Sequence, residues 1–222
     1  MQRETLLKLI RTGFNLLSNF RVEGAEYIPA SGPIILTTNH ISRLDYPALL
    51  MCTDREDVIA IVATKYREKV FFRWIIETLR AIWIERETSD FSAFREAIEY
   101  LNRGWIVGIS PEGTRSTTGA LQPGKPGAAL IVRKTGLPVL PVAVSGTADL
   151  GKQLGHLKKT DILVRFGEPY HIPLTTDEEE AKNWLNKATD EIMCRIAALL
   201  PPERRGVYAD HPRLKELLNS FI

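Results

Sequence analysis

The sequence has little cysteine. Cys52 and Cys194 are the two cysteines in 222 residues, and their wide separation excludes a disulfide framework and the paired spacing of a zinc site. Both fall in apolar, helix-like patterns, so we expect buried free thiols. Such cysteine usage is typical of a reducing compartment.

Long apolar runs and charge of one sign are also lacking. The sequence has no stretch of about 18 uncharged apolar residues, so we expect no membrane-spanning helix. Glu4, Lys8 and Arg11 interrupt the N-terminal region, which argues against a secretory signal. A net charge of +2 is too small to indicate a nucleic-acid partner. No Gly-x-Gly-x-x-Gly follows a strand-like run, so a dinucleotide site is not supported.

What is present is an alternation of strand-like and helix-like segments. Apolar β-type runs occupy residues 34–38, 58–63, 81–84, 105–109, 139–144 and 162–166. Helical patterns occupy residues 46–51, 70–79, 89–103, 128–134 and 176–200. This alternation and the length predict one α/β domain over residues 1–222. We expect an N-terminal amphipathic helix (1–20), a core (21–200) and a C-terminal tail (201–222).

The stretch from Asn39 to Asp45 lies between the first strand-like run and a helix start. A histidine at the carboxyl end of a strand lies at the edge of an α/β sheet where ligands usually bind. Near neutral pH, His40 can take or give a proton, and a nearby carboxylate such as Asp45 can fix its tautomer. Asp45 also has a structural interpretation, because it could cap the helix that contains Pro47. From these residues alone both interpretations stay open.

A second stretch points to an anion. The strand-like run 105–109 leads into Ser110-Pro111-Glu112-Gly113-Thr114-Arg115-Ser116. A glycine that frees the backbone, hydroxyl groups and a guanidinium together favour binding of phosphate oxygens. In chain order, Arg86 follows the run 81–84 before this loop, and the apolar segment 137–142 comes after it.

These four blocks resemble the lysophospholipid (1-acylglycerol-3-phosphate) acyltransferase family. That family carries Asn-His-x-x-x-x-Asp, an Ile/Phe-x-Arg block, Glu-Gly-Thr-Arg-Ser and an apolar Val-Pro-Val-like block, and all four occur here in that order between about residues 23 and 147. Lys65, which follows the run 58–63, matches a further family position. The resemblance implies a mixed central sheet flanked by helices. It also implies transfer of a fatty acyl group from a thioester carrier, coenzyme A or acyl carrier protein, to a lysophospholipid hydroxyl.

The resemblance implies a catalytic role for His40 as the general base, oriented by Asp45. Positions five apart on a straight helix point about 140° apart, so the motif must bend where the strand meets the helix. We therefore predict that Asp45 lies in the first helical turn and His40 just before it. Their side chains should be in contact at roughly 2.6–3.2 Å.

The acceptor's phosphate needs cationic and N–H donors. The candidate substrate-binding residues are Lys65, Arg86, Gly113, Thr114 and Arg115. A role for Glu112 is implied but stays open between orienting Arg86 or Arg115 and bonding an acceptor hydroxyl, and Arg43 is expected to be solvated. Ser110 and Ser116 lack the Gly-x-Ser-x-Gly pattern of a nucleophile. We therefore expect direct attack on the thioester, without an acyl-enzyme, a metal or another cofactor.

Two segments have both a structural and a membrane interpretation. Residues 5–20 form an amphipathic pattern that suits either packing on the domain or a membrane surface, and the resemblance favours the membrane. Residues 70–79 are apolar nearly all round, and we expect a buried helix; contact with an acyl chain or membrane is the alternative. A peripheral enzyme at the inner, cytoplasmic face of the membrane is the resulting prediction.

Three other functions remain open. The acceptor could be another lysolipid or a glycolipid. The protein could bind lipids without catalysis. A serine hydrolase would need Ser110 as its nucleophile.

Overall fold

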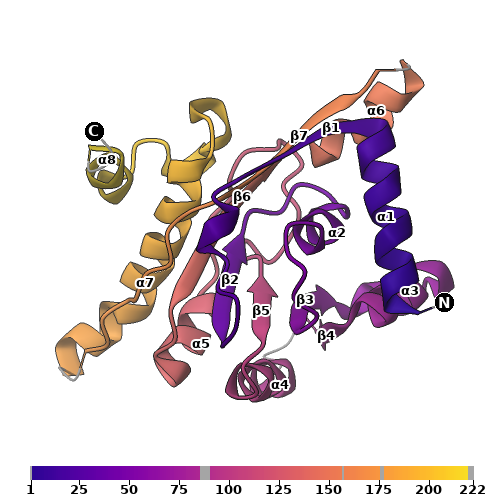
Figure 1. Cartoon of the computed structure of the whole chain (residues 1–222). Coiled ribbons are helices and arrows are strands. Elements are labelled where there is room, and N and C mark those ends of the chain that lie inside the picture. Colours follow the sequence, from indigo (N-terminus) through magenta and orange to yellow (C-terminus); the bar gives the residue numbers. More distant parts are fainter. Residues whose placement is uncertain (1, 86–90, 157, 176–177, 220–222) are drawn as a thin grey trace.

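A computed structural model describes residues 2–85, 91–156, 158–175 and 178–219. Seven strands of the described part form one sheet in the order β1-β7-β6-β2-β5-β3-β4 (Figure 1). The strands are β1 (Ser18–Glu23), β2 (Ile34–Thr38), β3 (Val58–Ala63), β4 (Ala81–Ile84), β5 (Ile106–Ile109), β6 (Val139–Ser145) and β7 (Thr160–Phe166).

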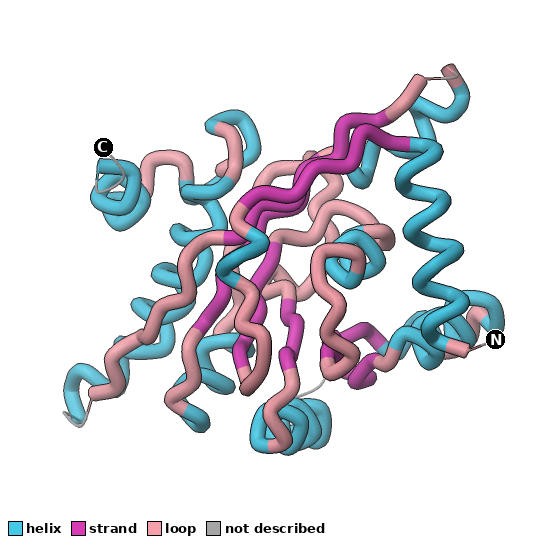
Figure 2. The backbone as a smooth tube through the Cα atoms, in the orientation of Figure 1, coloured by secondary structure: helices cyan, strands magenta, loops and turns pink. Residues whose placement is uncertain are grey.

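The sheet is mixed, and the prediction of a mixed sheet is confirmed. Strands β2 to β6 run parallel to one another, whereas β7 is antiparallel to β6, and β1 runs parallel to β7. The tube view shows β1 and β7 side by side as a long pair (Figure 2). Because five parallel strands point the same way, their carboxyl ends meet at one edge of the sheet.

Helices cover both faces of the sheet. Ile35 on β2 belongs to one buried cluster, while its neighbours Ile34 and Leu36 belong to the other, as the alternation of side chains along a strand requires. The first cluster is covered by α4 (Phe91–Asn102), α5 (Gly127–Thr135), α7 (Glu178–Leu199) and α8 (Pro212–Asn219). The second is covered by α1 (Arg3–Leu17), α2 (Asp45–Leu50), α3 (Val70–Leu79) and α6 (Leu150–Gly155).

The N-terminal helix is shorter than predicted, and the first strand was missed. The expected helix runs to residue 20, but α1 ends at Leu17 and Ser18 takes an extended conformation (φ −140°). The Ser18 hydroxyl donates to the Phe14 carbonyl at 2.6 Å and so satisfies one of the last helical carbonyls. The chain then pairs with β7, residue for residue from Ser18 opposite Thr160.

The prediction of a C-terminal tail was also wrong. Residues 212–219 form α8, and Leu214 and Leu217 are buried in the same cluster as α7. Leu214, Leu217 and Leu218 lie at helical spacing, so one face of α8 is apolar and packs on the domain.

Helix α3 is exposed where burial was predicted. Val70, Phe71 and Trp74 are 73%, 66% and 37% exposed, and Leu79 is the buried residue of this helix. A helix that is apolar on all sides is usually buried, but the described part of the chain leaves several of these apolar side chains exposed.

Among the described residues, no helix is long and apolar enough to cross a lipid bilayer.

Candidate active site

The carboxyl edge of the parallel strands brings the predicted motifs together. Thr37 on β2 pairs with Ile109 on β5, and Thr38 pairs with Val142 on β6. The loops after these three strands therefore leave the sheet at the same level. The loops that follow β3 and β4 leave the same edge beyond β5. Arg86, predicted to bind the acceptor after β4, lies outside the described residues.

His40 and Asp45 are in contact, as predicted. The Nδ1 atom of His40 lies 2.8 Å from Oδ2 of Asp45, and Asp45 is the first residue of α2. A carboxylate oxygen can only accept, so Nδ1 carries the proton and Nε2 is the basic nitrogen of the neutral ring. The His40 side chain is 20% exposed, while that of Asp45 is 3% exposed. The ring can therefore reach a ligand while its orienting carboxylate stays sheltered.

The capping interpretation of Asp45 is wrong. The residue at the N-cap of α2 is Leu44, which makes no side-chain cap. Oδ2 of Asp45 instead accepts from the backbone N–H groups of Ile41 and Ser42, both at 2.8 Å, in addition to His40. The carboxylate thus points toward the preceding residues and fixes the conformation of residues 40–42 through three hydrogen bonds.

Asn39 anchors the start of this loop. Its Nδ2 donates to the Val144 carbonyl, and its Oδ1 accepts from the Val144 N–H, both at 2.8 Å. The buried amide therefore pairs with β6 much as another strand residue would. The sequence motif contains this asparagine, but its pairing partner lies on β6 and could not be found from local spacing.

Glu112 braces the backbone of His40 and is almost fully buried, with 2% exposure. Oε1 accepts from the His40 N–H at 2.7 Å, and Oε2 accepts from the Gln122 N–H at 2.9 Å. The Ser116 N–H donates to the His40 carbonyl at 2.8 Å. Burial raises the pKa of Glu112 to about 7, against the lowering effect of the two backbone donors and with a further rise from Asp45. These bonds give Glu112 a structural role that differs from both predicted ones.

The turn that contains Gly113 is formed, but its amide is engaged. Gly113 has φ +67°, a conformation that glycine adopts without strain, and its N–H donates to the Ser110 carbonyl at 3.0 Å. Thr114 is exposed and Arg115 is half-buried beside it. Phosphate binding through the Gly113 N–H is therefore not supported, and the guanidinium of Arg115 is the stronger candidate.

Three cations act on one phenol at this edge. The Arg43 guanidinium carbon lies 5.7 Å from the ring centre of Tyr66 and 4.9 Å from that of Phe72, and Lys65 Nζ lies 5.7 Å from the Tyr66 ring centre. Burial raises the pKa of Tyr66, but a hydrogen bond from Arg43 and the charges of Arg115, Lys65 and Arg43 outweigh it, so the pKa lies below its ordinary value. These charges favour an anion.

Tyr66 carries no motif that sequence reasoning could use, and Arg43 was expected to be solvated. Arg43 is exposed by residue area, yet its guanidinium lies close to two aromatic rings. The spacing of the His–Asp motif gives no sign of this contact, because both rings come from later in the chain.

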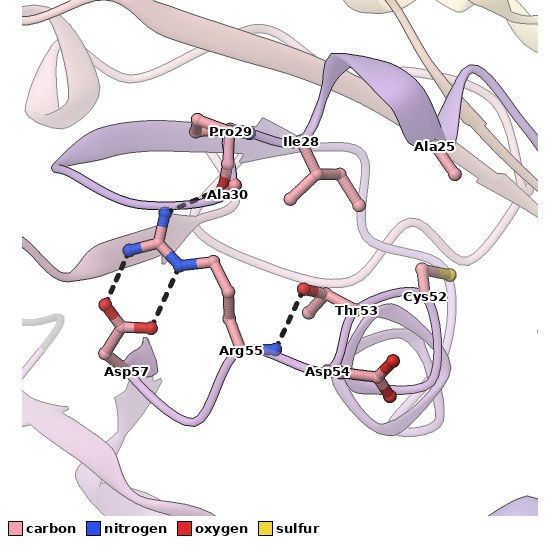
Figure 3. Close-up of a pocket in the computed structure, with 9 residues that line it drawn as sticks. All are labelled: Ala25, Ile28, Pro29, Ala30, Cys52, Thr53, Asp54, Arg55 and Asp57. Atoms are coloured by element: carbon pink, nitrogen blue, oxygen red, sulfur yellow. Dashed lines mark hydrogen bonds and ion pairs between the residues drawn. The ribbon is translucent and has the colours of Figure 1, made fainter.

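A surface hollow of about 540 Å³ lies at the opposite end of the strands, before β2 and β3 (Figure 3). Arg55 lines it and donates to four protein acceptors: both carboxylate oxygens of Asp57 and the carbonyls of Pro29 and Gly104. Arg55 thus holds the loops at that edge together, and four of its five N–H donors are engaged by protein.

The fold is an α/β domain whose carboxyl sheet edge carries the His40–Asp45 pair and the cations around Tyr66. Residues 19–145 match the family called Acyltransferase, so the match covers more than half of the chain. The chain belongs to the Acyltransferase family.

The chain is similar in sequence to acyltransferases from other organisms. The chloroplastic 1-acyl-sn-glycerol-3-phosphate acyltransferase BAT2 of Brassica napus is 30% identical over 156 residues, which is 68% of this chain but 44% of that protein. The chain thus spans less than half the length of this relative. The 1-acyl-sn-glycerol-3-phosphate acyltransferase of Bacillus subtilis is 26% identical over 157 residues, 71% of this chain and 76% of that protein.

The chain is also similar to a solved structure of an acyltransferase. The 1-acyl-sn-glycerophosphate acyltransferase PlsC of Thermotoga maritima superposes with a TM-score of 0.61 at 31% identity, covering 84% of this chain and 78% of that one. The predicted family and α/β fold are confirmed.

Proposed function

We propose that this protein transfers a fatty acyl group from a thioester carrier to the free hydroxyl of 1-acylglycerol-3-phosphate, giving phosphatidic acid for phospholipid synthesis. The observation that supports it most is the His40–Asp45 contact of 2.8 Å at the same sheet edge as the cations around Tyr66. A base and an anion site in one place suit an acceptor that carries both a hydroxyl and a phosphate. The names of the relatives support the same substrate.

The reaction needs a base because a neutral alcohol is a poor nucleophile. Nε2 of His40 takes the hydroxyl proton as the oxygen attacks the thioester carbonyl carbon. The tetrahedral adduct then breaks its carbon–sulfur bond, and the imidazolium returns the proton to the departing thiolate. Asp45 holds Nδ1–H throughout and stabilises the transient cation.

The acceptor's phosphate would lie among Lys65, Arg115 and Arg43, with the Tyr66 hydroxyl as a further donor. Arg86 remains a predicted member of this site. A planar guanidinium can bind two phosphate oxygens at once. We define Lys65, Arg115, Arg43 and Tyr66 as the acceptor site.

The protein would work at a lipid surface, peripherally and from the cytoplasmic side. Val70, Phe71 and Trp74 expose an apolar surface on α3, and Lys69 and Arg73 flank them on the exposed side of the same segment. Helix α1 packs against α3 and exposes Leu9 and Leu16. Apolar side chains beside cations favour an interface rich in anionic lipid.

The test is a panel of lysolipids with acyl-coenzyme A and acyl-carrier-protein donors. We expect 1-acylglycerol-3-phosphate to be the best acceptor, and His40→Ala to lower kcat by about 10²- to 10⁴-fold while vesicle binding is kept. His156→Ala, at an exposed histidine, is the matched control. If the wild type consumes neither donor with any acceptor but binds vesicles, the protein is a lipid-binding member of the family and the proposal is wrong.

A further inference from the structure

Thr147 lies against the face of Asp45 that is turned away from His40. Its hydroxyl donates to Oδ1 of Asp45 at 2.5 Å, across 102 positions of sequence. Thr147 is 1% exposed and Asp45 is 2% exposed. A hydrogen bond from a neutral hydroxyl to a buried carboxylate is short and strong because the acceptor is charged.

The two oxygens of Asp45 have separate tasks. Oδ2 accepts from His40 Nδ1 and from the backbone N–H groups of Ile41 and Ser42, whereas Oδ1 accepts from Thr147. The terminal torsion of an aspartate is soft and broadly distributed. A donor on the second oxygen therefore fixes the plane of the carboxylate, and with it the direction in which Oδ2 meets the imidazole.

The backbone places the Thr147 hydroxyl with little freedom. Gly146, just before it, has φ +85°, and a Cβ there would lie 1.9 Å from the Asp161 carbonyl oxygen. The Asp149 N–H closes the turn onto the Gly146 carbonyl at 3.0 Å. Two residues upstream of Gly146, Val144 is held by both polar atoms of the Asn39 amide. The end of β6 is thus tied to the start of the His40 loop.

We propose that Thr147 is a positioning residue of the His40–Asp45 pair. This inference rests on the proposed function, because it assumes that His40 is the base. Thr147 lies outside the four sequence blocks and touches no reacting atom. Its removal should misalign the imidazole during proton transfer and leave substrate binding intact.

The first experiment compares Thr147→Val, Thr147→Ser and Thr160→Val in the full chain. Valine keeps the shape and removes the donor, and serine keeps the donor. Thr160 is a buried threonine on β7 whose hydroxyl has no hydrogen-bond partner among the residues that the structure describes, so Thr160→Val controls for the loss of a hydroxyl. Thr147→Ala is the second variant if Thr147→Val does not fold.

We expect Thr147→Val to lower kcat by about 10- to 100-fold, since a small misplacement of a catalytic group has an effect of this size. KM for both substrates should stay within about twofold, because binding contacts are unchanged. Thr147→Ser and Thr160→Val should keep wild-type kcat. The proposal is wrong if Thr147→Val keeps wild-type kcat, or if Thr147→Ser loses as much as Thr147→Val.

A second readout does not depend on turnover. Imidazole nitrogen NMR is tractable because the chain has four histidines. We expect the wild type and Thr147→Ser to show the Nδ1–H tautomer of His40, and Thr147→Val to show a mixture. If His40 shows the Nδ1–H tautomer in the wild type and in both variants, Thr147 does not position the His40–Asp45 pair. If the wild type is inactive while the tautomers change as expected, the acyltransferase proposal fails and the positioning role stands.

Discussion

The carboxylate of Glu112 accepts a hydrogen bond from the backbone N–H of His40 at 2.7 Å, across 72 positions of sequence. The Ser116 N–H donates a hydrogen bond to the His40 carbonyl at 2.8 Å. Both polar backbone groups of His40 are therefore held by the second motif. The ring can be oriented by Asp45 only because the backbone beneath it is fixed in this way.

The first prediction concerns Glu112 and pH. Burial raises the pKa of this carboxyl to about 7, so the folded protein holds the proton more tightly than the unfolded chain. The contribution of the protonated Glu112 carboxyl to the free energy of unfolding is fully present below the pKa of the unfolded chain. It is lost as the pH rises through the folded-state pKa of about 7. Urea unfolding of wild type and Glu112→Gln from pH 5 to 8 should show the wild-type advantage shrinking as pH rises.

Glu168→Gln is the control for that experiment, because Glu168 is an exposed carboxyl after β7. Its difference from wild type should stay flat over the same range. A difference between wild type and Glu112→Gln that is independent of pH would show that Glu112 does not titrate in this window.

The parts of the site that the sequence predicted are local. His40 and Asp45 are five positions apart, and the geometry of one strand–helix junction decides whether they meet. Glu112 and Thr147 were not assigned their roles because their partners lie 72 and 102 positions away. The register of parallel strands β5 and β6 against β2 creates those contacts, and spacing along the chain does not encode it.

The same reason explains the errors in the fold. Phe20 continues the apolar face of the preceding helix in the sequence, so the pattern favours helix through that residue. Pairing of Ser18–Glu23 with β7 overrides it, and tertiary contacts commonly override local preference. For α3, apolar content alone does not distinguish a helix buried in the protein from one whose apolar side chains are exposed.

The second prediction separates phosphate binding from a general effect on activity. Arg115→Ala should lower kcat/KM for 1-acylglycerol-3-phosphate by about 10- to 100-fold, the size expected for a lost charged hydrogen bond. With a monoacylglycerol acceptor, which has no phosphate, the change should be slight. Lys134→Ala, an exposed cation in the last turn of α5, is the control. Equal losses with both acceptors would remove Arg115 from the acceptor site.

The third prediction concerns Tyr66. Tyr66→Phe keeps the ring that packs beside Phe72, with ring centres 6.2 Å apart, and removes the hydroxyl that Arg43 bonds. KM for the phosphate acceptor should rise by about 10- to 100-fold, the size expected for a lost hydrogen bond to a charged group, while kcat is kept. A fall in kcat without a rise in KM would place the hydroxyl near the reacting atoms instead.

The fourth prediction tests whether α8 belongs to the core. Leu214 is 0% exposed, so Leu214→Ala should lower the free energy of unfolding by about 2–5 kcal/mol, the usual effect of a buried leucine-to-alanine change. Val207→Ala, at a residue 61% exposed, should have little effect. Equal midpoints for both variants in urea unfolding would mean that residues 201–219 do not contribute to stability.

The fifth prediction concerns the exposed apolar surface of α3, which we propose meets the membrane. Phe71 and Trp74 pack against one another on α3, with ring centres 6.2 Å apart, and both are exposed. Replacing both by serine removes apolar area from the interface, which should weaken binding to anionic vesicles by about 10- to 100-fold. Binding is measured by co-sedimentation.

The control for that surface is Phe91→Ser. Phe91 is 73% exposed at the start of α4, which covers the other face of the sheet, so this change removes one exposed aromatic ring without touching α3. Turnover of a short-chain, water-soluble acceptor should be equal in wild type and in the Phe71→Ser, Trp74→Ser variant, because the acceptor no longer has to be taken from a membrane. If the Phe71→Ser, Trp74→Ser variant binds vesicles as tightly as the wild type and the Phe91→Ser control, α3 does not contact the lipid and the proposed membrane surface is wrong.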